Sequence, residues 1–416
     1  MNKFKPISIS LSPNVEKDDI KLTLNLIIRP WLWKKGKAIK ELEEQFKKYL
    51  DIKYAFSFNS GRSCLFAILK ALNLPEKSSV LLQAFTCNAA VNPVLWRKLK
   101  PIYVDCNKDN FNIDVKDLKN KLSASMSDII LIVQHTFGLP ANMDEITAIA
   151  PSLVIIEDCA HALGAEFNNK KVGTFGKASF FSFSRDKVIS SVYGGMVATN
   201  DDSIAEKLEK IQKEFGMPSR FWIFQQLLHP ILLGYAILPI YNFFDLGKFF
   251  LVLSQWLHIL SKAIHWKENR GLKPDYFPRA LPNALAIMAL NQFFKLDKFY
   301  EHRKKISDYY KKNLKDTLFV LPLENENVKQ SYLRFAIKHQ KAHEIIYEAW
   351  HKENILLGDW YTTPIAPFDT KLDKMQYDLG SCKNAEELSR KTLNLPTHIN
   401  ISEKDAERII NFLKRY

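Results

Sequence analysis

Short apolar runs alternate with amphipathic stretches through the first half of the chain. Seven runs rich in β-branched and aromatic residues have the length of strands, and they cover residues 54–59, 79–85, 100–105, 128–136, 153–158, 178–184 and 195–200. Apolar positions at helical spacing separate most of these runs, as in residues 63–72 and 92–99. The alternation is typical of βαβ units. It predicts an α/β fold with a mostly parallel seven-stranded sheet and helices on both faces.

The pattern changes after residue 294. The predicted elements are then a long charged helix over 296–314, a strand over 331–339, a helix over 342–354 and a last helix that begins after Ser402. Helices and a strand in this order do not continue the βαβ rhythm. We therefore expect a large domain of residues 1–294 and a smaller C-terminal α+β domain of residues 295–416.

An apolar segment precedes this change. Residues 221–244 and 249–261 carry no charge, and only two charged residues separate these two arms. A membrane-spanning helix needs about 20 apolar residues, but prolines and a glycine interrupt the first arm and the second is too short. We expect an insertion over residues 216–275 that is either an interfacial or re-entrant helical pair or a hairpin buried at a dimer interface. Aromatic residues such as Trp222 and Trp256, with basic flanks, would suit a headgroup boundary.

Composition narrows the possible partners. The 416 residues are 47% hydrophobic and 25% charged, as in an ordinary globular protein. The net charge is +14, but the lysines are scattered, so we expect no nucleic-acid partner; anionic substrates or an anionic membrane surface suit the charge better.

The five cysteines show no CxxC spacing, which predicts reduced thiols and no metal site. The N-terminal residues lack the apolar core of a signal peptide, so we expect a cytoplasmic protein, peripheral on the inner membrane face if the apolar segment contacts lipid.

Two ionisable residues follow predicted strands. Asp158 ends the run at 153–158, and Lys187 follows the run at 178–184 among several phenylalanines. Burial there would disfavour the ammonium form of the lysine, and a neutral lysine amine can condense with an aldehyde. Ligands of parallel sheets gather at the carboxyl ends of the strands, so both residues are active-site candidates. The alternatives are a helix-capping role for Asp158 and an exposed surface position for Lys187.

A candidate phosphate-binding turn lies at residues 59–63, with the sequence Asn-Ser-Gly-Arg-Ser, between a predicted strand and a predicted helix. Gly61 would let the backbone approach an anion, and the first amides of the helix would face it. Arg62 adds a guanidinium that can bind phosphate oxygens. Because many helices begin after Ser-Gly, this turn is informative only together with Asp158 and Lys187.

In this combination the chain resembles the DegT/StrS family of sugar aminotransferases, which are pyridoxal-phosphate enzymes. The resemblance is carried by the motifs DCAHALG (158–164), SFSRDK (182–187) and GG (194–195), and by the longer stretches HTFGLPANMDEI (135–146) and LNLPTHINISEKDAERII (393–410). It extends nearly end to end. It implies the PLP-dependent transferase fold of type I, the fold of aspartate aminotransferase, and pyridoxal 5'-phosphate as the cofactor.

The resemblance implies a role for each matching residue. Lys187 would carry the cofactor and move a proton between substrate and cofactor. Asp158 would keep the pyridine nitrogen protonated, which makes the ring an electron sink, and His161 would lie beside the ring. The phosphate of the cofactor would be held by Gly61, Arg62 and Ser182.

Several positions depart from the family pattern. Cys87 would lie against the cofactor, at the place where the family usually has an aromatic residue that stacks on the ring. Val188 stands where an asparagine follows the lysine, and Tyr193 where a glutamate precedes the two glycines. The family's Asn-Tyr-Arg is replaced around Arg279. The cofactor-binding residues are thus retained, whereas the substrate pocket is altered.

The resemblance implies an aminotransferase that moves an amino group, from L-glutamate, onto a nucleotide- or lipid-linked keto-sugar in cell-surface glycan or related biosynthesis. It also implies a homodimer. A dehydratase branch of the family has histidine in place of the lysine, so Lys187 argues against it. The other alternative is a membrane-associated binding or scaffold protein that kept the fold and lost turnover. A half-reaction with glutamate distinguishes this alternative from an enzyme.

Overall fold

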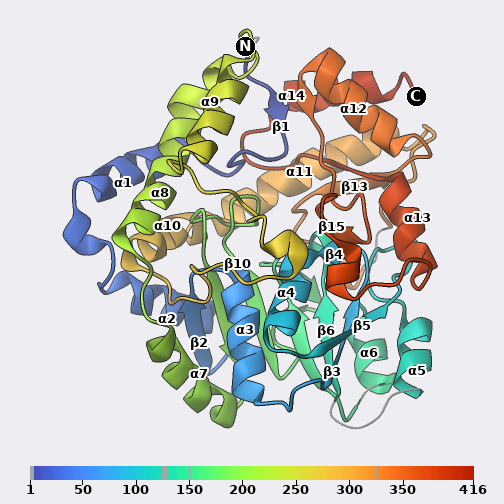
Figure 1. Cartoon of the computed structure of the whole chain (residues 1–416). Coiled ribbons are helices and arrows are strands. Elements are labelled where there is room, and N and C mark those ends of the chain that lie inside the picture. Colours follow the sequence, from blue (N-terminus) through green and yellow to red (C-terminus); the bar gives the residue numbers. More distant parts are fainter. Residues whose placement is uncertain (1–3, 124–128, 150, 324–325) are drawn as a thin grey trace.

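A seven-stranded sheet forms the centre of the computed structural model, which describes residues 4–123, 129–149, 151–323 and 326–416 (Figure 1). Its strands are β2 (Tyr54–Phe58), β3 (Ser79–Gln83), β5 (Lys100–Val104), β6 (Ile129–Gln134), β7 (Val154–Asp158), β10 (Ala178–Ser182) and β11 (Gly195–Thr199). The order is β2-β11-β10-β7-β6-β3-β5, and β11 alone runs antiparallel to its neighbours in this sheet. All seven predicted strands are confirmed; residue 128, which begins the fourth predicted run, lies outside the described residues.

Helices cover both faces of this sheet, as predicted. Side chains alternate between the faces along a strand, so Phe180 and Val197 belong to one core while Phe181 and Met196 belong to another. The first core is shared with α3 (Gly61–Leu72), α4 (Asn88–Trp96) and α7 (Asp202–Phe215), and the second with α2 (Ala38–Leu50) and α10 (Asn283–Phe293). A further core lies beneath α5 (Val115–Ser123) and α6 (Met143–Ile149).

The C-terminal part has a core of its own. Its elements are α11 (Leu296–Leu314), β13 (Phe335–Lys338), α12 (Ala342–Glu353), β14 (Ile355–Leu356), α13 (Lys383–Lys391), β16 (Thr392–Leu395) and α14 (Glu403–Leu413). The three predicted helices are present, and Ser402 caps α14 by accepting a hydrogen bond from the amide of Asp405. The N-terminal strand β1 (Ile7–Ser8) pairs in parallel with β14, so the first residues of the chain lie with this part. A domain boundary near residue 294 remains our proposal.

Two small sheets connect distant parts of the chain. In the first, β4 (Thr86–Cys87) pairs with β15 (Ile365–Ala366), which brings the C-terminal part beside a predicted cofactor residue. The second joins β8 (Glu166–Phe167), β9 (Lys170–Lys171) and β12 (Val328–Lys329). Each small sheet thus pairs a strand from the large domain with a strand from the C-terminal part.

The apolar segment folds as a helical hairpin. Its first arm is α8 (Arg220–Ile231), continued by a π-helical turn, η3 (Leu232–Ile237), and a 3-10 turn, η4 (Leu238–Ile240); its second arm is α9 (Leu246–Trp256). The first arm packs against α1 (Lys17–Ile27) and α10, and Figure 1 shows α9 at the edge of the molecule near the N-terminus. Residues 220–240 are long and apolar enough to cross a membrane, but 44% of their most apolar window is buried inside the protein.

One expectation about this segment is wrong. Trp222, which we expected at a membrane boundary, is only 6% exposed and packs against Tyr193 and Tyr276. The hairpin thus has a buried inner side and an exposed outer side, which an uncharged sequence does not distinguish.

Candidate active site

A cavity of about 270 Å³ lies where the strands of the large sheet end. All the residues predicted to bind the cofactor or act in catalysis line it, namely Gly61, Arg62, Cys87, Asp158, His161, Ser182 and Lys187. They come from the carboxyl ends of β7 and β10, from β4, from the first turn of α3 and from the loops after these strands. The crossover topology therefore brings together residues that are far apart in sequence.

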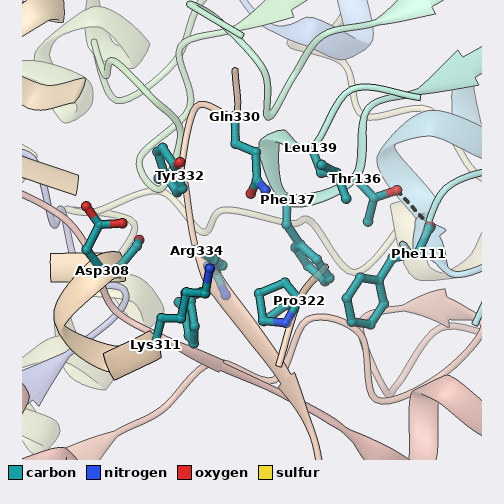
Figure 2. A pocket seen from close by; sticks show the side chains of 13 residues that line it. Phe111, Thr136, Phe137, Leu139, Asp308, Lys311, Pro322, Gln330, Tyr332 and Arg334 are labelled. Atoms are coloured by element: carbon teal, nitrogen blue, oxygen red, sulfur yellow. Dashed lines mark hydrogen bonds between the residues drawn. The ribbon is translucent and has the colours of Figure 1, made fainter. Parts of the chain in front are cut away.

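A second, smaller cavity lies beside the C-terminal part. Figure 2 shows Phe137, Pro322 and Arg334 gathered around it. Its volume is about 30 Å³, enough for roughly two water molecules. It is too small for a sugar or a cofactor. The cavity that Lys187 and Asp158 line is the candidate active site because the predicted residues meet there.

Lys187 lies in the loop after β10, and its backbone is held on both sides. Its amide donates to the carbonyl of Ser184 at 3.2 Å, and its carbonyl accepts from the side chain of Asn14 at 2.5 Å. Burial lowers the pKa of the amine to about 8, although Cys87 and Asp158 act in the opposite direction. A lowered pKa makes the neutral, nucleophilic amine more available near neutral pH. The alternative of an exposed surface lysine is wrong.

Asp158 ends β7 with its carboxylate on the cavity wall. Its Oδ1 accepts a hydrogen bond from the amide of Ala160 at 2.9 Å, within a turn, and no helix begins at this point among the described residues. The alternative of a helix cap is therefore wrong. The side chain is 6% exposed; burial raises the pKa of the carboxyl, and the charge of Lys187 lowers it. Such a carboxylate can accept a hydrogen bond from a protonated ring nitrogen.

The residues behind Asp158 fix its strand. The neighbouring Glu157 points to the other face of the sheet and accepts hydrogen bonds from the amides of Gly173, Phe175 and Gly176, each at 2.7 Å. Nε2 of His135 lies 3.2 Å from the same carboxylate. Because these groups are buried and bonded to one another, they hold the end of β7 in place.

His161 is a neutral imidazole in this site. Its Nδ1 accepts a hydrogen bond from the amide of Phe137 at 3.2 Å, so the ring proton is on Nε2, which lies 3.4 Å from the hydroxyl of Tyr361. Burial, with the charges of Lys187 and Arg334, holds the pKa of His161 well below its ordinary value. The imidazole can therefore donate a hydrogen bond through Nε2 without carrying a charge.

An anion cradle lies at the start of α3. Ser60 caps the helix by accepting from the amide of Ser63 at 3.0 Å, and the first turn faces the cavity. A Cβ atom on Gly61 would come within 3.1 Å of the Cβ of Ser182, so only a glycine fits here without a shift. Helix amides and the hydroxyl of Ser182 suit a phosphate. The residues present therefore fit pyridoxal phosphate, with the cradle for its phosphate, Lys187 for its aldehyde and Asp158 for its ring nitrogen.

Arg62 lines the cavity but is already engaged. Its Nη1 forms an ion pair with Glu268, and its Nη2 donates to the carbonyl of Ala263 at 3.1 Å. Both side chains of the pair are buried, with 7% and 0% exposed. Burial alone would lower the pKa of Arg62, but Glu268 raises it. A part for Arg62 in holding the phosphate remains our proposal.

The segment after the hairpin forms one wall of the cavity. Residues 261–268, which we name the strap, contribute Ala263 and Ile264 to the lining. The strap is tied down by Arg185, whose Nη2 donates to the carbonyl and hydroxyl of Ser261 at 2.7 Å each. The hydroxyl of Tyr193 donates to the carbonyl of Lys262 at 2.6 Å.

Sequence reasoning missed the aromatic residues of the C-terminal part. Trp360 lies in the cavity wall, with its ring 5.0 Å from that of His161 at an angle of 15°. The guanidinium of Arg334 lies 3.3 Å from the centroid of the same ring. Trp360 thus provides an aromatic surface in a cavity where Cys87 provides none. No local sequence signal indicated it, since its partners lie far away in the chain.

The comparison with known proteins decides the family. A family model described as the DegT/DnrJ/EryC1/StrS aminotransferase family matches residues 14–236 and 277–414. The chain belongs to this family. The predicted membership of an aminotransferase family is therefore confirmed, and residues 237–276, which contain α9 and the strap, lie outside the match.

Two curated proteins match this chain over different shares of its length. The uncharacterized protein MJ1066 of Methanocaldococcus jannaschii is 37% identical over 212 residues, which are 50% of this chain and 54% of that protein. GDP-perosamine synthase of Escherichia coli O157:H7 is 28% identical over 316 residues, which are 76% of this chain and 73% of that protein.

Solved structures confirm the predicted fold. Helicobacter pylori PseC, an aminotransferase involved in the biosynthesis of pseudoaminic acid, superposes with a TM-score of 0.75 at 24% identity and covers 99% of both chains. The putative sugar aminotransferase Spr1654 of Streptococcus pneumoniae, in its PMP form, gives a TM-score of 0.75 at 18% identity and covers 99% of this chain and 98% of its own. At these identities the likeness concerns the fold alone.

Proposed function

We propose that this member of the family is a pyridoxal-phosphate-dependent aminotransferase that transfers an amino group to a keto-sugar. The observation that carries the proposal is the meeting of three groups in one cavity. These are the amine of Lys187, the carboxylate of Asp158 and the anion cradle formed by Gly61 and Ser182. Each group matches one part of the cofactor. The amine can bind its aldehyde, the carboxylate its ring nitrogen, and the cradle its phosphate.

Pyridoxal phosphate, when bound, supplies an electron sink for the carbanion that forms at the amine-bearing carbon. The protein's own residues supply the rest. The neutral Nζ of Lys187 would act as the base that moves a proton between substrate and cofactor. The carboxylate of Asp158 would hold the ring nitrogen and keep its proton in place. His161 donates a hydrogen bond through Nε2, and Trp360 excludes water from the side of the cavity next to Lys187.

The substrates are inferred from relatives. Two of these carry nucleotide sugars in their names: GDP-perosamine synthase, and the UDP-4-amino-4,6-dideoxy-N-acetyl-beta-L-altrosamine transaminase of Campylobacter jejuni, which is 26% identical over 398 residues. A third is the spore coat polysaccharide biosynthesis protein SpsC of Bacillus subtilis. We propose a nucleotide- or lipid-linked keto-sugar as acceptor, L-glutamate as donor and a role in glycan biosynthesis on the cytoplasmic side.

The test is a half-reaction with L-glutamate on protein loaded with the cofactor. We expect the visible absorbance of the lysine-bound cofactor to bleach and one equivalent of 2-oxoglutarate to form. Keto-sugar nucleotides should then restore the absorbance. Lys187→Ala should fold but show neither the absorbance nor the reaction. Bound cofactor that responds to no amino donor would contradict the proposal and favour a binding protein without turnover.

We propose a homodimer as the active form, as the family resemblance implies. Sedimentation at several protein concentrations, with the half-reaction measured in parallel, tests this. A monomer with full activity would contradict it. We propose that Arg279 reaches a phosphate bound by the partner chain, in place of the asparagine that the family has. Within one chain its guanidinium donates to the carbonyls of Phe215, Asp275 and Pro278, so that phosphate would compete with these bonds.

A further inference from the structure

The outer side of the hairpin exposes an unusual amount of apolar surface. We name as the apolar patch the residues Phe244, Phe249, Phe250, Val252, Trp256 and Leu257, each of which is between 45% and 86% exposed. Phe249, Val252 and Trp256 follow one another at helical spacing, so they form a stripe along α9. Soluble monomers rarely expose so many large apolar side chains together, and such patches mark interaction sites.

The patch is one side of a well-packed element. The inner side of the hairpin buries Leu233, Ile237, Tyr241 and Leu260 in a core of their own. A Cβ atom on Gly247 would lie 2.4 Å from the backbone of Ile237 and Tyr241, so the two arms approach each other closely. The exposed side chains are therefore held outward by a packed hairpin.

The charge around the patch is mainly positive. Between Asp245 and Lys267 the charged residues are one aspartate and three lysines, namely Lys248, Lys262 and Lys267. Lys248 pairs with Asp245 and Lys267 pairs with Asp275, while Lys262 is exposed. Aromatic side chains bordered by lysines are the composition found where proteins meet lipid headgroups.

We propose that the apolar patch docks on the surface of an anionic lipid bilayer. The hairpin lies in the interface rather than across the membrane, because its first arm is partly buried against α1 and α10. A second copy of the chain fits less well. In a two-fold contact the same patch meets itself, so two surfaces of the same net positive charge would face each other. This inference goes beyond the proposed activity and does not depend on it.

Docking would bring the cavity close to the headgroups. The exposed Ile259 and the cavity-lining Ala263 are four positions apart, so their Cα atoms lie at most about 15 Å apart at about 3.8 Å per peptide. The strap thus connects the docked surface to the wall of the active site.

The experiment is flotation of the full chain with vesicles of phosphatidylglycerol and phosphatidylcholine, compared with vesicles of phosphatidylcholine alone. We expect binding to the anionic vesicles that weakens with salt. The triple variant Phe244→Ser, Phe249→Ser, Trp256→Ser should lose binding about tenfold or more, because three aromatic side chains no longer enter the interface. Its half-reaction with glutamate should stay at the wild-type rate.

A matched control replaces exposed apolar residues outside the hairpin. The triple variant Phe294→Ser, Leu318→Ser, Leu379→Ser removes side chains that are 65% to 75% exposed, and it should bind vesicles like the wild type. Wild-type protein that does not float with anionic vesicles at low salt would overturn the proposal. So would patch variants that change only the oligomeric state in sedimentation, since that result assigns the patch to a second copy. Neither result depends on whether the glutamate reaction succeeds.

Discussion

The ammonium nitrogen of Lys187 lies 4.6 Å from the centroid of the indole ring of Trp360. Lys187 follows β10 of the central sheet, and Trp360 belongs to the C-terminal part. Their contact therefore closes the cavity between the sheet and the C-terminal part. Trp360 also stacks on His161, and Arg334 covers its ring from the C-terminal part. The aromatic surface beside the proposed cofactor site therefore comes from a position that follows α12, and not from Cys87.

Replacing Trp360 tests this arrangement. We expect Trp360→Ala to raise the dissociation constant for pyridoxal phosphate about two- to tenfold, since an aromatic contact contributes about 0.5–1.5 kcal/mol. Trp360→Phe should recover most of the affinity. Titration of the apoprotein, followed by absorbance, measures both. Trp31→Ala, at a position that is 68% exposed, is the control and should bind the cofactor normally. Unchanged affinity in Trp360→Ala would contradict a contact.

The lowered pKa of Lys187 predicts a pH dependence. In the folded apoprotein the amine loses its proton near pH 8, against an ordinary value of 10.5. The rate of cofactor uptake should therefore rise with pH through about 8 and then level off, because the neutral amine reacts. A midpoint near 10 would contradict the burial of this amine.

The same pKa has a consequence for stability, with a definite sign. Below pH 8 the amine is protonated in both the folded and the unfolded chain, so its destabilising effect is fully present. Between pH 8 and 10.5 the unfolded chain binds the proton and the folded chain does not. The contribution of Lys187 to the free energy of unfolding should therefore increase with pH in this window. Comparison of apoprotein with its Lys187→Met variant isolates that contribution.

Asp158→Asn should separate binding from reaction. The amide has nearly the same shape, so the cofactor should still bind, but a neutral group cannot hold a proton on the ring nitrogen. We expect the glutamate half-reaction to slow about 10²- to 10³-fold, the range for loss of one electrostatic catalytic group. Stopped-flow absorbance gives the rate. A wild-type rate would leave Asp158 without a chemical role.

The ion pair between Arg62 and Glu268 should matter for stability. Glu268→Gln leaves the guanidinium buried without its counter-charge, and we expect the free energy of unfolding to fall by about 3–5 kcal/mol. Denaturation in urea measures the loss. The double variant Arg62→Met, Glu268→Gln should regain part of it, because no buried charge is left.

An exposed pair provides the comparison. Lys98 and Glu76 lie 2.7 Å apart with 72% and 65% of their side chains exposed. Glu76→Gln should leave the free energy of unfolding nearly unchanged, since water screens the pair. Equal losses in Glu268→Gln and Glu76→Gln would show that the burial of the first pair has no energetic effect.

Much of the fold could be predicted because burial leaves a local pattern. The seven strands are confirmed, and α11 begins and ends at the predicted residues, since its charged and apolar positions alternate at helical spacing. The site residues Asp158, His161 and Lys187 could be named because they stand at strand ends and match motifs. They line one cavity, as the topology of a parallel sheet requires.

The rest depends on contacts between distant segments. Trp360, Arg334 and Glu268 carry no local signal, because their partners are brought to them only by the folded chain. The orientation of the hairpin was also hidden. In an uncharged arm whose polar residues Gln225, Gln226 and His229 are themselves buried, the pattern does not tell the buried Trp222 from the exposed Phe221.

The strap also bears on how this chain can be shortened or recombined with its relatives. Deleting residues 237–276 would remove the carboxylate that neutralises Arg62 and the serine that binds Arg185, and it would leave two guanidinium groups in the wall of an active site. A transplant of the strap into another protein would need arginines at the corresponding places to anchor it. The strap and the two arginines therefore depend on each other, and a change in one requires a change in the other.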